Sequence, residues 1–410
     1  MKLLNVDTIE SAREKLLAAA GAALPGTEIV DFYDSLGRVL AEDVRAAENI
    51  PDFRKSTVDG YAVRSKDTQG VTDSIPVFLD VVETIQMGRA PEKTVGPGQA
   101  SYVPTGGMLP EGADAVVMVE YCEDFDAGSI AVYDSVSYGR NVIDEGEDVS
   151  AGSVLMPKGR VIRPQEIGVL ASAGVKQVRV FRPWTITVIS TGDELIGMDD
   201  ELQKAKTRDI NTYSVMSSAK KHGFRIVGTH VLKDDRELIK KTIESALQDS
   251  DVVAVSGGSS QGEKDHTASV MDEISAGGVF THGIALKPGK PTILAYDDRS
   301  ETVMIGLPGH PAAAMLVFEL MIIWLYRQLT GQPEPVTTIA RVTENVPSAG
   351  GRATCLLVSL EQKQDGIYMA EPVLGKSGLM TTLTRADGYT VIGTNDEGLQ
   401  EGQLVEVTLF

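Results

Sequence analysis

The middle of the chain alternates between two hydrophobic periods. Beyond Pro183, short β-branched apolar runs predict buried strands, and the segments between them place apolar residues at helical spacing. The predicted strands are 185–190, 225–232, 251–256 and 302–306. The predicted helices are 212–222, 236–247, 267–274 and a long helix from about Pro311. This order predicts a mostly parallel sheet with helices on both faces, and such sheets bind ligands at the carboxyl ends of their strands.

The segments on either side of this region have different patterns of apolar and polar residues. Asp7 and Glu10 predict a capping box for a helix over residues 11–20, which Gly21 would end. From about residue 52 to 145, short apolar runs broken by Gly, Pro and Asp predict a small all-β unit. Alternating runs after residue 336 predict β structure again.

We therefore predict an α/β multidomain protein. Residues 1–182 form an N-terminal region of helical and β segments, which carries the all-β insert at about 52–145. Residues 183–331 form the central, mostly parallel α/β sheet domain, and residues 332–410 form a C-terminal β domain. Gly and Pro in the stretch 331–335 are typical of a linker between the last two.

Composition narrows the class of protein. The 410 residues are 42% hydrophobic and 23% charged, as in ordinary soluble globular proteins. The formal net charge of −20 argues against a nucleic-acid partner, because the protein would repel nucleic-acid phosphates. Any anion-binding site must therefore be a local basic island, which gives Lys287 and Lys290 particular weight.

Cysteine content and hydropathy favour a cytoplasmic protein. Cys122 and Cys355 are the only cysteines, so we expect neither a disulfide framework nor a cysteine metal site. The first residues lack the apolar stretch of a signal peptide. The most apolar segment, residues 311–326, is short for a membrane span and contains Glu319, so we expect a buried helix and no membrane association.

The strongest chemical signal is a glycine-rich turn between a predicted strand and a predicted helix, residues 256–265. Backbone N–H groups of such a turn, together with the positive end of the helix dipole, bind phosphate. Its spacing is neither that of a P-loop nor that of a dinucleotide-binding fingerprint. Asp265 at its end could bind Mg²⁺ or orient a water molecule for attack on a phosphoanhydride.

A second segment, residues 286–291, places Lys287 and Lys290 around a Pro-Gly turn, here called the lysine turn. Prolines restrict the backbone, so the ammonium groups lose less conformational freedom when they bind an anion. The alternative is a pair of solvated surface lysines. Together with the glycine-rich turn, the lysine turn indicates a site for a phosphorylated ligand, an oxyanion, or both.

The other strand ends carry weaker signals. Thr191 and Gly192 could hydrogen-bond a phosphate or a pterin-like heterocycle, and Glu194 could hold a metal, or the segment could be an ordinary turn. Asp234 follows the next strand, where an N-cap is the plain alternative. His310 lies in the turn after the last strand and is more often structural there. None of the five histidines has metal-ligand spacing.

These segments occur in the same order in the MoeA family of molybdopterin molybdenumtransferases, which includes the E domain of gephyrin. The chain resembles that family along essentially its whole length. The matching motifs are 56–63, 103–106, 110–117, 146–148, 190–195, 256–265, 286–291, 306–311, 375–378 and 386–389. So many motifs in one order make the resemblance specific. It implies a central domain of the MoCF type, similar to MogA.

The resemblance implies an enzyme of molybdenum cofactor biosynthesis. Family members insert molybdate into adenylylated molybdopterin with Mg²⁺ taking part, and they release AMP and the molybdenum-loaded molybdopterin. The resemblance also implies an elongated homodimer whose active-site cleft includes residues of both subunits. A molybdopterin adenylyltransferase is the implied source of the adenylylated substrate.

The family's functional positions transfer onto this sequence motif by motif. The implied catalytic residues are Asp59, Glu194, Asp234, Ser260 and Asp265, with Glu194 and Asp265 as Mg²⁺ ligands. The residues predicted to bind molybdopterin-AMP or molybdate, from the turns above and from the resemblance, are Thr105, Asp148, Thr191, Gly192, Gly257, Gly258, Ser259, Lys287, Lys290, Pro308, Pro311, Arg352 and Ser377. Ser260 and Asp265 match the pair associated with AMP removal. The molybdate region is matched by Lys287, Lys290, Arg352 and Ser377, donors that suit a dianion with four acceptor oxygens.

The chain departs from the family pattern at several positions. His310 stands where many relatives have Asn, Ala313 where they often have Ser, and Ile143 where a basic residue is common. Cys355 and Leu357 replace an aromatic and a second basic residue in the C-terminal domain. Each change removes a donor or a positive charge near the expected anion site. The changes leave open a tungstate-inserting enzyme or a ligand-binding paralogue without turnover. The flanking domains argue against a further alternative, a molybdopterin adenylyltransferase.

Overall fold

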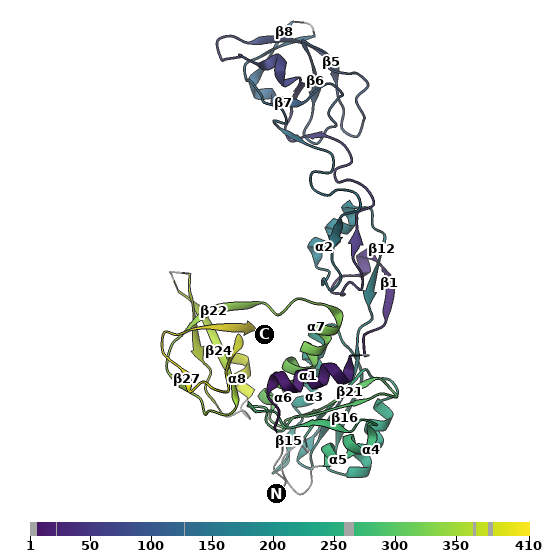
Figure 1. The fold of residues 1–410 in the computed structure, drawn as a ribbon, viewed down its shortest axis with the longest axis vertical. Helices are drawn as coiled ribbons and strands as arrows, with labels where there is room; N and C mark the ends of the chain where they lie inside the picture. Colours follow the sequence, from purple (N-terminus) through teal and green to yellow (C-terminus); the bar gives the residue numbers. More distant parts are fainter. Residues whose placement is uncertain (1–5, 22, 127, 258–265, 364–365, 376–379) are drawn as a thin grey trace.

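The computed structural model describes residues 6–410, except residues 22, 127, 258–265, 364–365 and 376–379. The molecule is elongated (Figure 1). A β unit forms one end, here called the distal β unit. A narrow connecting region follows, and an α/β sheet with a β domain beside it forms the other end.

The first helix, α1 (Ile9–Ala20), packs into the core of the α/β sheet through Leu16 and its neighbours at helical spacing. Its N-cap is Thr8, whose hydroxyl accepts from Ser11 N at 3.1 Å. The predicted cap, Asp7, is therefore wrong by one residue. Asp7 instead accepts a hydrogen bond from the Thr281 hydroxyl at 2.8 Å, because a partner from the sheet is within its reach.

The connecting region is built from short antiparallel pairs. β1 (Thr27–Asp31) pairs with β12 (Gln177–Phe181), and β2 (Val44–Arg45) pairs with β11 (Val154–Met156). α2 (Pro164–Ser172) packs there on a small apolar core. Because each pair joins an early segment to a late one, the chain runs out to the distal β unit and returns along the same path.

The distal β unit is a six-stranded sheet in the order β7-β4-β6-β5-β9-β8. Its strands are β4 (Gly60–Val63), β5 (Val77–Thr84), β6 (Gln99–Val103), β7 (Ala115–Met118), β8 (Cys122–Asp126) and β9 (Ser129–Val132). β3 (Lys55–Ser56) pairs with β10 (Val142–Ile143) where this unit meets the connecting region. The predicted β insert is confirmed.

The α/β sheet has the strand order β16-β13-β17-β21-β20-β18. The parallel strands are β13 (Thr185–Thr191), β16 (Arg225–Leu232), β17 (Val252–Ser256) and β21 (Thr302–Leu307), as predicted. β20 (Ile293–Asp297) and β18 (Val279–His282) add an antiparallel edge that the sequence analysis does not predict.

Successive residues of the central strands pack into two separate hydrophobic cores, because side chains alternate between the faces of a sheet. Val252 and Ala254 pack in one core with α1, α3 (Asn211–Lys221) and α6 (Pro311–Phe318). Val253 and Val255 pack in the other with α4 (Arg236–Ala246) and α5 (His266–Ile274). Helices therefore cover both faces of the sheet (Figure 1), which confirms the predicted fold class.

The long apolar helix continues from α6 through a π-helical turn, Glu319–Ile323, into α7 (Trp324–Thr330). The whole helix, Pro311–Thr330, has 20 residues, so its length and composition alone would allow it to cross a membrane. The apolar segment singled out in the sequence, residues 311–326, is shorter than this helix, so the argument that the segment is too short to span a membrane is wrong. However, 67% of its most apolar window is buried inside the protein, as in a core helix.

The C-terminal domain is built on a third six-stranded sheet, in the order β19-β24-β25-β22-β28-β26. Its strands are β19 (Leu286–Lys287), β22 (Thr337–Val342), β24 (Ala353–Gln362), β25 (Tyr368–Pro372), β26 (Gly388–Ile392) and β28 (Leu404–Leu409). A further pairing of β24 with β26 closes the sheet into a barrel. A side pair, β23 (Val346–Pro347) with β27 (Gly398–Leu399), and α8 (Met380–Arg385) complete the domain.

Candidate functional site

The carboxyl ends of the parallel strands lie in one row. The register pairs Ser190 of β13 with Ser256 of β17, and Ser256 with Leu307 of β21. On the other side, Thr191 pairs with Leu232, the last residue of β16. This edge is where α/β sheets bind ligands, and the predicted turns all begin there.

At the end of β13, Thr191 is buried and its hydroxyl has no hydrogen-bond partner among the described residues. The Gly192 amide donates to Leu232 O at 3.0 Å, so this N–H is engaged within the fold. The exposed Glu194 carboxylate lies over Gly192, where a Cβ would be 2.8 Å from Glu194 Oε2. Glycine therefore lets a carboxylate stand close to the strand end.

The end of β16 carries two neighbouring aspartates with different roles. Asp235 is the N-cap of α4, and its side chain accepts from Leu238 N at 2.9 Å. Asp234 does not cap the helix, and its backbone N–H donates to Asp193 Oδ1 at 3.3 Å. The N-cap alternative therefore applies to Asp235, which leaves the Asp234 carboxylate as a candidate for the site.

β17 ends in a turn that requires glycine. Gly257 has φ +102°, and a Cβ there would lie 2.1 Å from Thr191 O. The Thr267 hydroxyl donates to Gly257 O at 3.3 Å and holds the turn from α5. The predicted residues of this turn that lie outside the described residues are Gly258, Ser259, Ser260 and Asp265.

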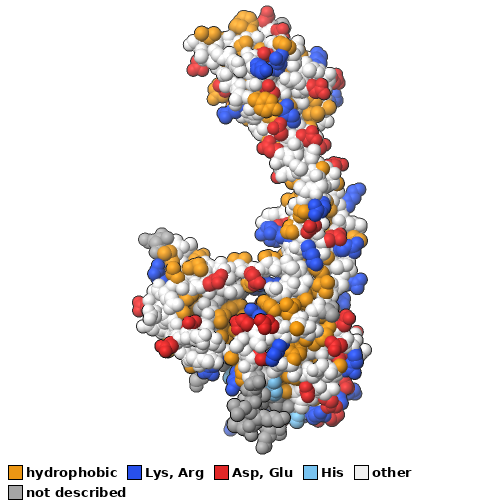
Figure 2. All heavy atoms as spheres, viewed as in Figure 1, with side chains coloured by type: hydrophobic (Ala, Val, Ile, Leu, Met, Phe, Trp, Pro, Cys, Tyr) orange, Lys and Arg blue, Asp and Glu red, His pale blue; other side chains and the backbone are white. Residues whose placement is uncertain are grey.

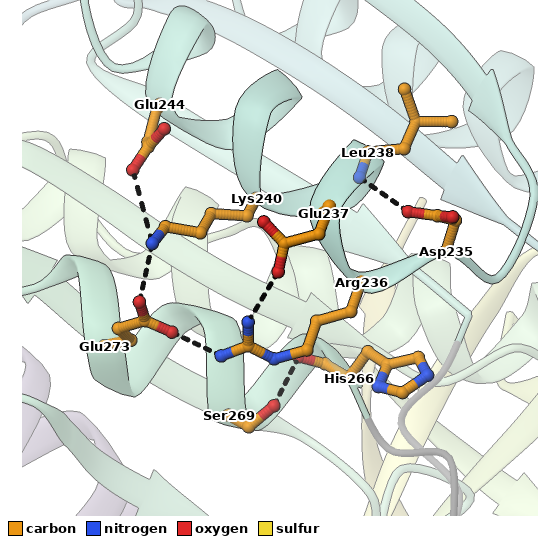
Figure 3. A network of polar contacts seen from close by, with 9 residues as sticks. All are labelled: Asp235, Arg236, Glu237, Leu238, Lys240, Glu244, His266, Ser269 and Glu273. Atoms are coloured by element: carbon orange, nitrogen blue, oxygen red, sulfur yellow. Dashed lines mark hydrogen bonds and ion pairs between the residues drawn. The ribbon is translucent and has the colours of Figure 1, made fainter.

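A network of charged side chains holds α4 against α5, the helices that begin beside this turn (Figure 3). Glu273 of α5 accepts from Lys240 of α4 at 2.6 Å and also from Arg236. These hydrogen bonds lower the pKa of Glu273. In the first turn of α5, Ser269 donates to His266 O at 3.0 Å. Pairs at the surface each stabilise little, so the network mainly holds the first two turns of α4 against the last turn of α5.

The segment before α3 links three of the strand ends. Asp209 Oδ1 accepts from Ser190 Oγ at 2.9 Å, and Asn211 Nδ2 donates to Ser256 Oγ at 2.5 Å and to Gly309 O at 2.9 Å. Asp209 and Asn211 are missed by the sequence analysis. The available signal is a pair of cap-type residues just before a predicted helix. The cap position is instead Ile210, and neither side chain acts as the N-cap.

The turn after β21 is short and stiff. Pro308 is buried, His310 occupies the N-cap position of α6, and Pro311 is the first residue of the helix. Proline suits this position because its missing N–H would have no partner in the helix. Ala313, a predicted departure, is buried in the first turn of α6.

The lysine turn lies at the same edge of the sheet. Ile293, the first residue of β20, pairs near the carboxyl end of β21, so the turn before β20 stands beside the strand ends. Gly289 has φ +136°, and a Cβ there would lie 2.9 Å from the Val317 side chain of α6. Lys287 and Lys290 are therefore exposed on a turn whose backbone is held against the core.

The C-terminal barrel brings an arginine to the lysine turn. Lys287 of β19 pairs with Thr354 of β24, and Ala353 N donates to Ala285 O at 2.8 Å. The exposed Arg352 directly precedes Ala353, the first residue of β24 and the register partner of Leu286 at the start of the lysine turn. Ser377 lies outside the described residues. The fold thus assembles the local basic group that an anion site in an acidic protein needs.

Two of the sequence departures belong to a core. Cys355 and Leu357 are 4% and 9% exposed and pack beside Tyr389 in the core that the barrel shares with the α/β domain. Hydrophobic side chains also gather on the surface around this junction (Figure 2). Burial raises the pKa of the Cys355 thiol, which keeps it neutral. The expectation that these two departures remove groups from the anion site is therefore wrong. Ile143 lies farther away, in β10.

The remaining predicted residues lie far from this edge within one chain. Asp59 Oδ1 accepts from Thr105 N at 2.7 Å and from the Thr105 hydroxyl at 3.0 Å, and these hydrogen bonds lower the pKa of the exposed Asp59. Both residues belong to the distal β unit, next to β4 and β6 (Figure 1). Asp148 is exposed in the connecting region, where its N–H donates to Ile50 O at 3.2 Å.

Models of known protein families match most of the chain. The MoeA N-terminal region (domain I and II) matches residues 7–174, a probable molybdopterin binding domain matches residues 187–328, and the MoeA C-terminal region (domain IV) matches residues 340–410.

Individual relatives match over nearly their full length. A putative molybdopterin biosynthesis protein of Methanocaldococcus jannaschii is 33% identical and covers 93% of this chain and 92% of its own. The molybdopterin molybdenumtransferase of Bacillus subtilis is 32% identical and covers 94% of this chain and 90% of its own. Two solved structures of molybdopterin biosynthesis MoeA proteins from Pyrococcus horikoshii each cover 99% of this chain, with TM-scores of 0.80 and 0.81 and identities of 36% and 28%. The match covers 99% and 100% of those two chains.

Proposed function

The chain belongs to the MoeA family of molybdopterin molybdenumtransferases, and we propose that it binds its substrates where the carboxyl edge of the α/β sheet meets the lysine turn. The protein is an enzyme of molybdenum cofactor biosynthesis that inserts molybdenum into molybdopterin, with molybdate as a substrate. The observation that carries the proposed site is the pairing of β19 with β24, which places Ala353, the residue after Arg352, opposite Leu286 at the start of the lysine turn.

Adenylylated molybdopterin is the proposed form of the organic substrate. Its phosphoanhydride would lie at the glycine-rich turn after β17, because Gly257 leaves room for close approach and helix α5 follows the turn. Gly258 and Ser259 are the proposed phosphate contacts that follow in the chain. The Thr191 hydroxyl supports this placement, since a buried hydroxyl without a partner favours a ligand that supplies one.

Mg²⁺ is the proposed metal. This ion is commonly held by one or two carboxylates together with substrate phosphates rather than by an all-protein cage. The described ranges contain no group of three or more His, Cys, Asp or Glu residues placed to share a metal, and Glu194 stands exposed at the strand edge. One carboxylate from Glu194, a second from Asp265 and phosphate oxygens fit that chemistry. When bound, Mg²⁺ would stabilise the negative charge that develops on the molybdopterin phosphate as the phosphoanhydride bond breaks.

The protein's own groups would direct water to the adenylyl phosphorus. Attack by water breaks the bond between the adenylyl phosphorus and the bridging oxygen, which leaves with the molybdopterin phosphate, and the hydrated adenylyl group is released as AMP. Asp234 and Asp265 are the proposed carboxylates that orient this water, and Ser260 is the proposed hydrogen-bond donor to the AMP phosphate. Pro308 and Pro311 shape the turn that closes this side of the site.

Molybdate would bind at the lysine turn. The dianion has four acceptor oxygens, which suit the ammonium groups of Lys287 and Lys290, the guanidinium of Arg352 and the Ser377 hydroxyl. The rigid backbone around Gly289 lowers the entropy that the lysines lose on binding.

A homodimer is the proposed assembly. Asp59 and Thr105 lie next to β4 and β6 in the distal β unit and Asp148 lies in the connecting region, all away from the strand edge, so they would serve the site of a second copy. We also propose a cytoplasmic location, a handover of the substrate from a molybdopterin adenylyltransferase, and the domain division 1–182, 183–331 and 332–410. The family-model ranges 7–174, 187–328 and 340–410 support the division.

The deciding experiment measures AMP release from adenylylated molybdopterin by the purified protein with Mg²⁺, with molybdate and tungstate titrated separately. We expect release that molybdate stimulates. Stimulation by tungstate alone would favour the tungstate alternative. No release with either anion would favour a ligand-binding paralogue, and consumption of ATP would favour an adenylyltransferase. The full-length match to molybdenumtransferases, flanking domains included, weighs against that last alternative.

A further inference from the structure

Two acceptor atoms at the strand edge are buried without a partner among the described residues. They are Asp209 Oδ2 and Asn211 Oδ1, and their residues are 4% and 8% exposed. Leaving a buried polar atom unpaired costs about 1–3 kcal/mol, so native proteins rarely keep such atoms without a reason. Here both atoms lie on the one short segment that ties the strand ends together.

The rest of each side chain is firmly held. Asp209 Oδ1 accepts from Ser190 Oγ at 2.9 Å and from Thr212 N at 3.3 Å. Asn211 Nδ2 donates to Gly309 O at 2.9 Å. The Gly309 carbonyl oxygen can only accept a hydrogen bond, so the side-chain nitrogen of Asn211 must face it. Asn211 Oδ1 is then the atom without a partner. Both free atoms are therefore fixed in place and are pure acceptors.

We propose that Asp209 Oδ2 and Asn211 Oδ1 bind the N–H donors of an amino-substituted heterocycle of the substrate. This inference rests on the proposed function, because the adenylylated substrate carries two such rings, the pterin and the adenine. The acceptors are anchored to Ser190 and Ser256, which are register partners on neighbouring strands. Neighbouring strands lie about 4.8 Å apart, a spacing that one bicyclic ring can span.

A divalent cation fits this pair less well than an N–H donor. Asp209 is the only ionisable carboxylate of the pair, and the described part of the chain has no group of three or more His, Cys, Asp or Glu residues around it. The acceptors are also buried, and a site that hydrogen-bonds a ring N–H rejects analogues without that donor because its polar atoms then stay unpaired. The segment therefore contributes recognition of the ring rather than charge neutralisation.

The test compares Asp209→Asn with a matched buried aspartate. The Asn side chain keeps an oxygen for Ser190 and Thr212 N, but it places an amide N–H where Oδ2 stood, facing the ligand donor. The control is Asp297→Asn, at a residue that is 2% exposed, whose carboxylate accepts from Arg299 and Ser300 and which lies opposite Thr302 at the other end of β21. Binding of AMP and of molybdopterin is measured separately by titration calorimetry, with and without Mg²⁺, and each free protein is melted.

We expect Asp209→Asn to melt no lower than the wild type and to lose about tenfold or more in affinity for one ring. Asp297→Asn should lose stability and keep both affinities. Loss for AMP alone identifies the adenine, and loss for molybdopterin alone identifies the pterin. Unchanged affinities in Asp209→Asn overturn the inference while the proposed function stands. A loss of affinity in Asp209→Asn that occurs only with Mg²⁺ would also overturn the inference, because it would indicate a cation site. A wild-type protein that binds neither ring overturns both.

Discussion

Gly257→Ala offers a sharp test of how the strand edge is built. The residue has φ +102°, and an added Cβ would lie 2.1 Å from Thr191 O and 2.8 Å from the Thr191 hydroxyl. The nearest of these is a backbone atom of the neighbouring strand, so no side-chain rotation relieves the contact. The ends of β13 and β17 must move apart, and with them the buried Thr191 hydroxyl at the proposed phosphate site.

The expected cost has two parts. A left-handed backbone costs a residue with a Cβ about 1–2 kcal/mol, and forcing an atom into a packed region costs about 1–3 kcal/mol more. The sum of roughly 2–5 kcal/mol is a large share of the stability of an ordinary domain, about 5–15 kcal/mol. We therefore expect a marked local loss of stability together with a loss of AMP release.

Two other glycines separate the parts of this cost. Gly223 has φ +81°, whereas φ of Gly277 lies outside the left-handed region, and a Cβ at either would meet nothing within 4 Å. Gly223→Ala should show the backbone cost alone, and Gly277→Ala should show neither. Because a chain of this size need not unfold in one step, the assay is hydrogen exchange at the amides of β13 and β17, run beside AMP release. If Gly257→Ala matched Gly223→Ala in both readouts, the contact with Thr191 would not govern the edge.

Further predictions concern the anion site, the assembly and the connecting region. Lys287→Ala and Lys290→Ala should raise the molybdate concentration for half-maximal AMP release roughly 5- to 150-fold, which corresponds to losing a contact of about 1–3 kcal/mol, whereas Lys241→Ala on α4 should not. Unchanged molybdate dependence in both variants would refute the assignment. If Asp59 acts in the site of the second copy, the Asp59→Ala and Lys287→Ala proteins should each have little activity alone at low molybdate. Exchange of subunits between them should restore about a quarter of wild-type activity, because half of the dimers are then mixed and each mixed dimer holds one intact site. No recovery despite proven exchange would place both residues in a site within one chain. Hydrogen bonds from Arg163 and Arg160 lower the pKa of the buried Glu166 from 4.5 to about 2. The carboxylate therefore stabilises the connecting region fully above about pH 4.5 and loses that effect as the pH falls towards 2. Glu166→Gln should remove at most on the order of 3 kcal/mol at neutral pH and flatten the acid limb of the melting profile. Parallel profiles of the two proteins would contradict this.

The parallel strands could be predicted because burial on both faces leaves a direct trace in the sequence. β13, β17 and β21 are nearly continuous runs of buried residues, and their predicted bounds agree with the structure to within one residue at each end. β18 is only four residues long and mixes polar with apolar side chains. Its place in the sheet depends on pairing with β20, which no local pattern reports.

The position of the proposed site follows from topology, but its composition does not. A parallel sheet places the turns after its strands at one edge, whatever their residues, so the segments around Thr191 and Gly257 could be identified. Asn211 could not, because its partner Gly309 lies 98 positions further along the chain. Arg352 reaches the lysine turn through the same kind of long-range pairing, β19 with β24. The local signal at Asn211, a cap-type residue before a predicted helix, does not report its tertiary partners.

The net charge of the chain explains why the pairing of β19 with β24 matters. A net charge of −20 opposes binding of a dianion, but salt screens exposed charges beyond about 8 Å, so only nearby groups count. Two opposite unit charges 4 Å apart attract by about 4 kcal/mol at an effective dielectric constant of about 20. Lys287 and Lys290 therefore outweigh many distant carboxylates, and Arg352 adds a further such attraction only when the barrel is docked. Affinity for molybdate should accordingly depend on the junction between the α/β domain and the barrel, where the buried Cys355 and Leu357 hold β24 in place.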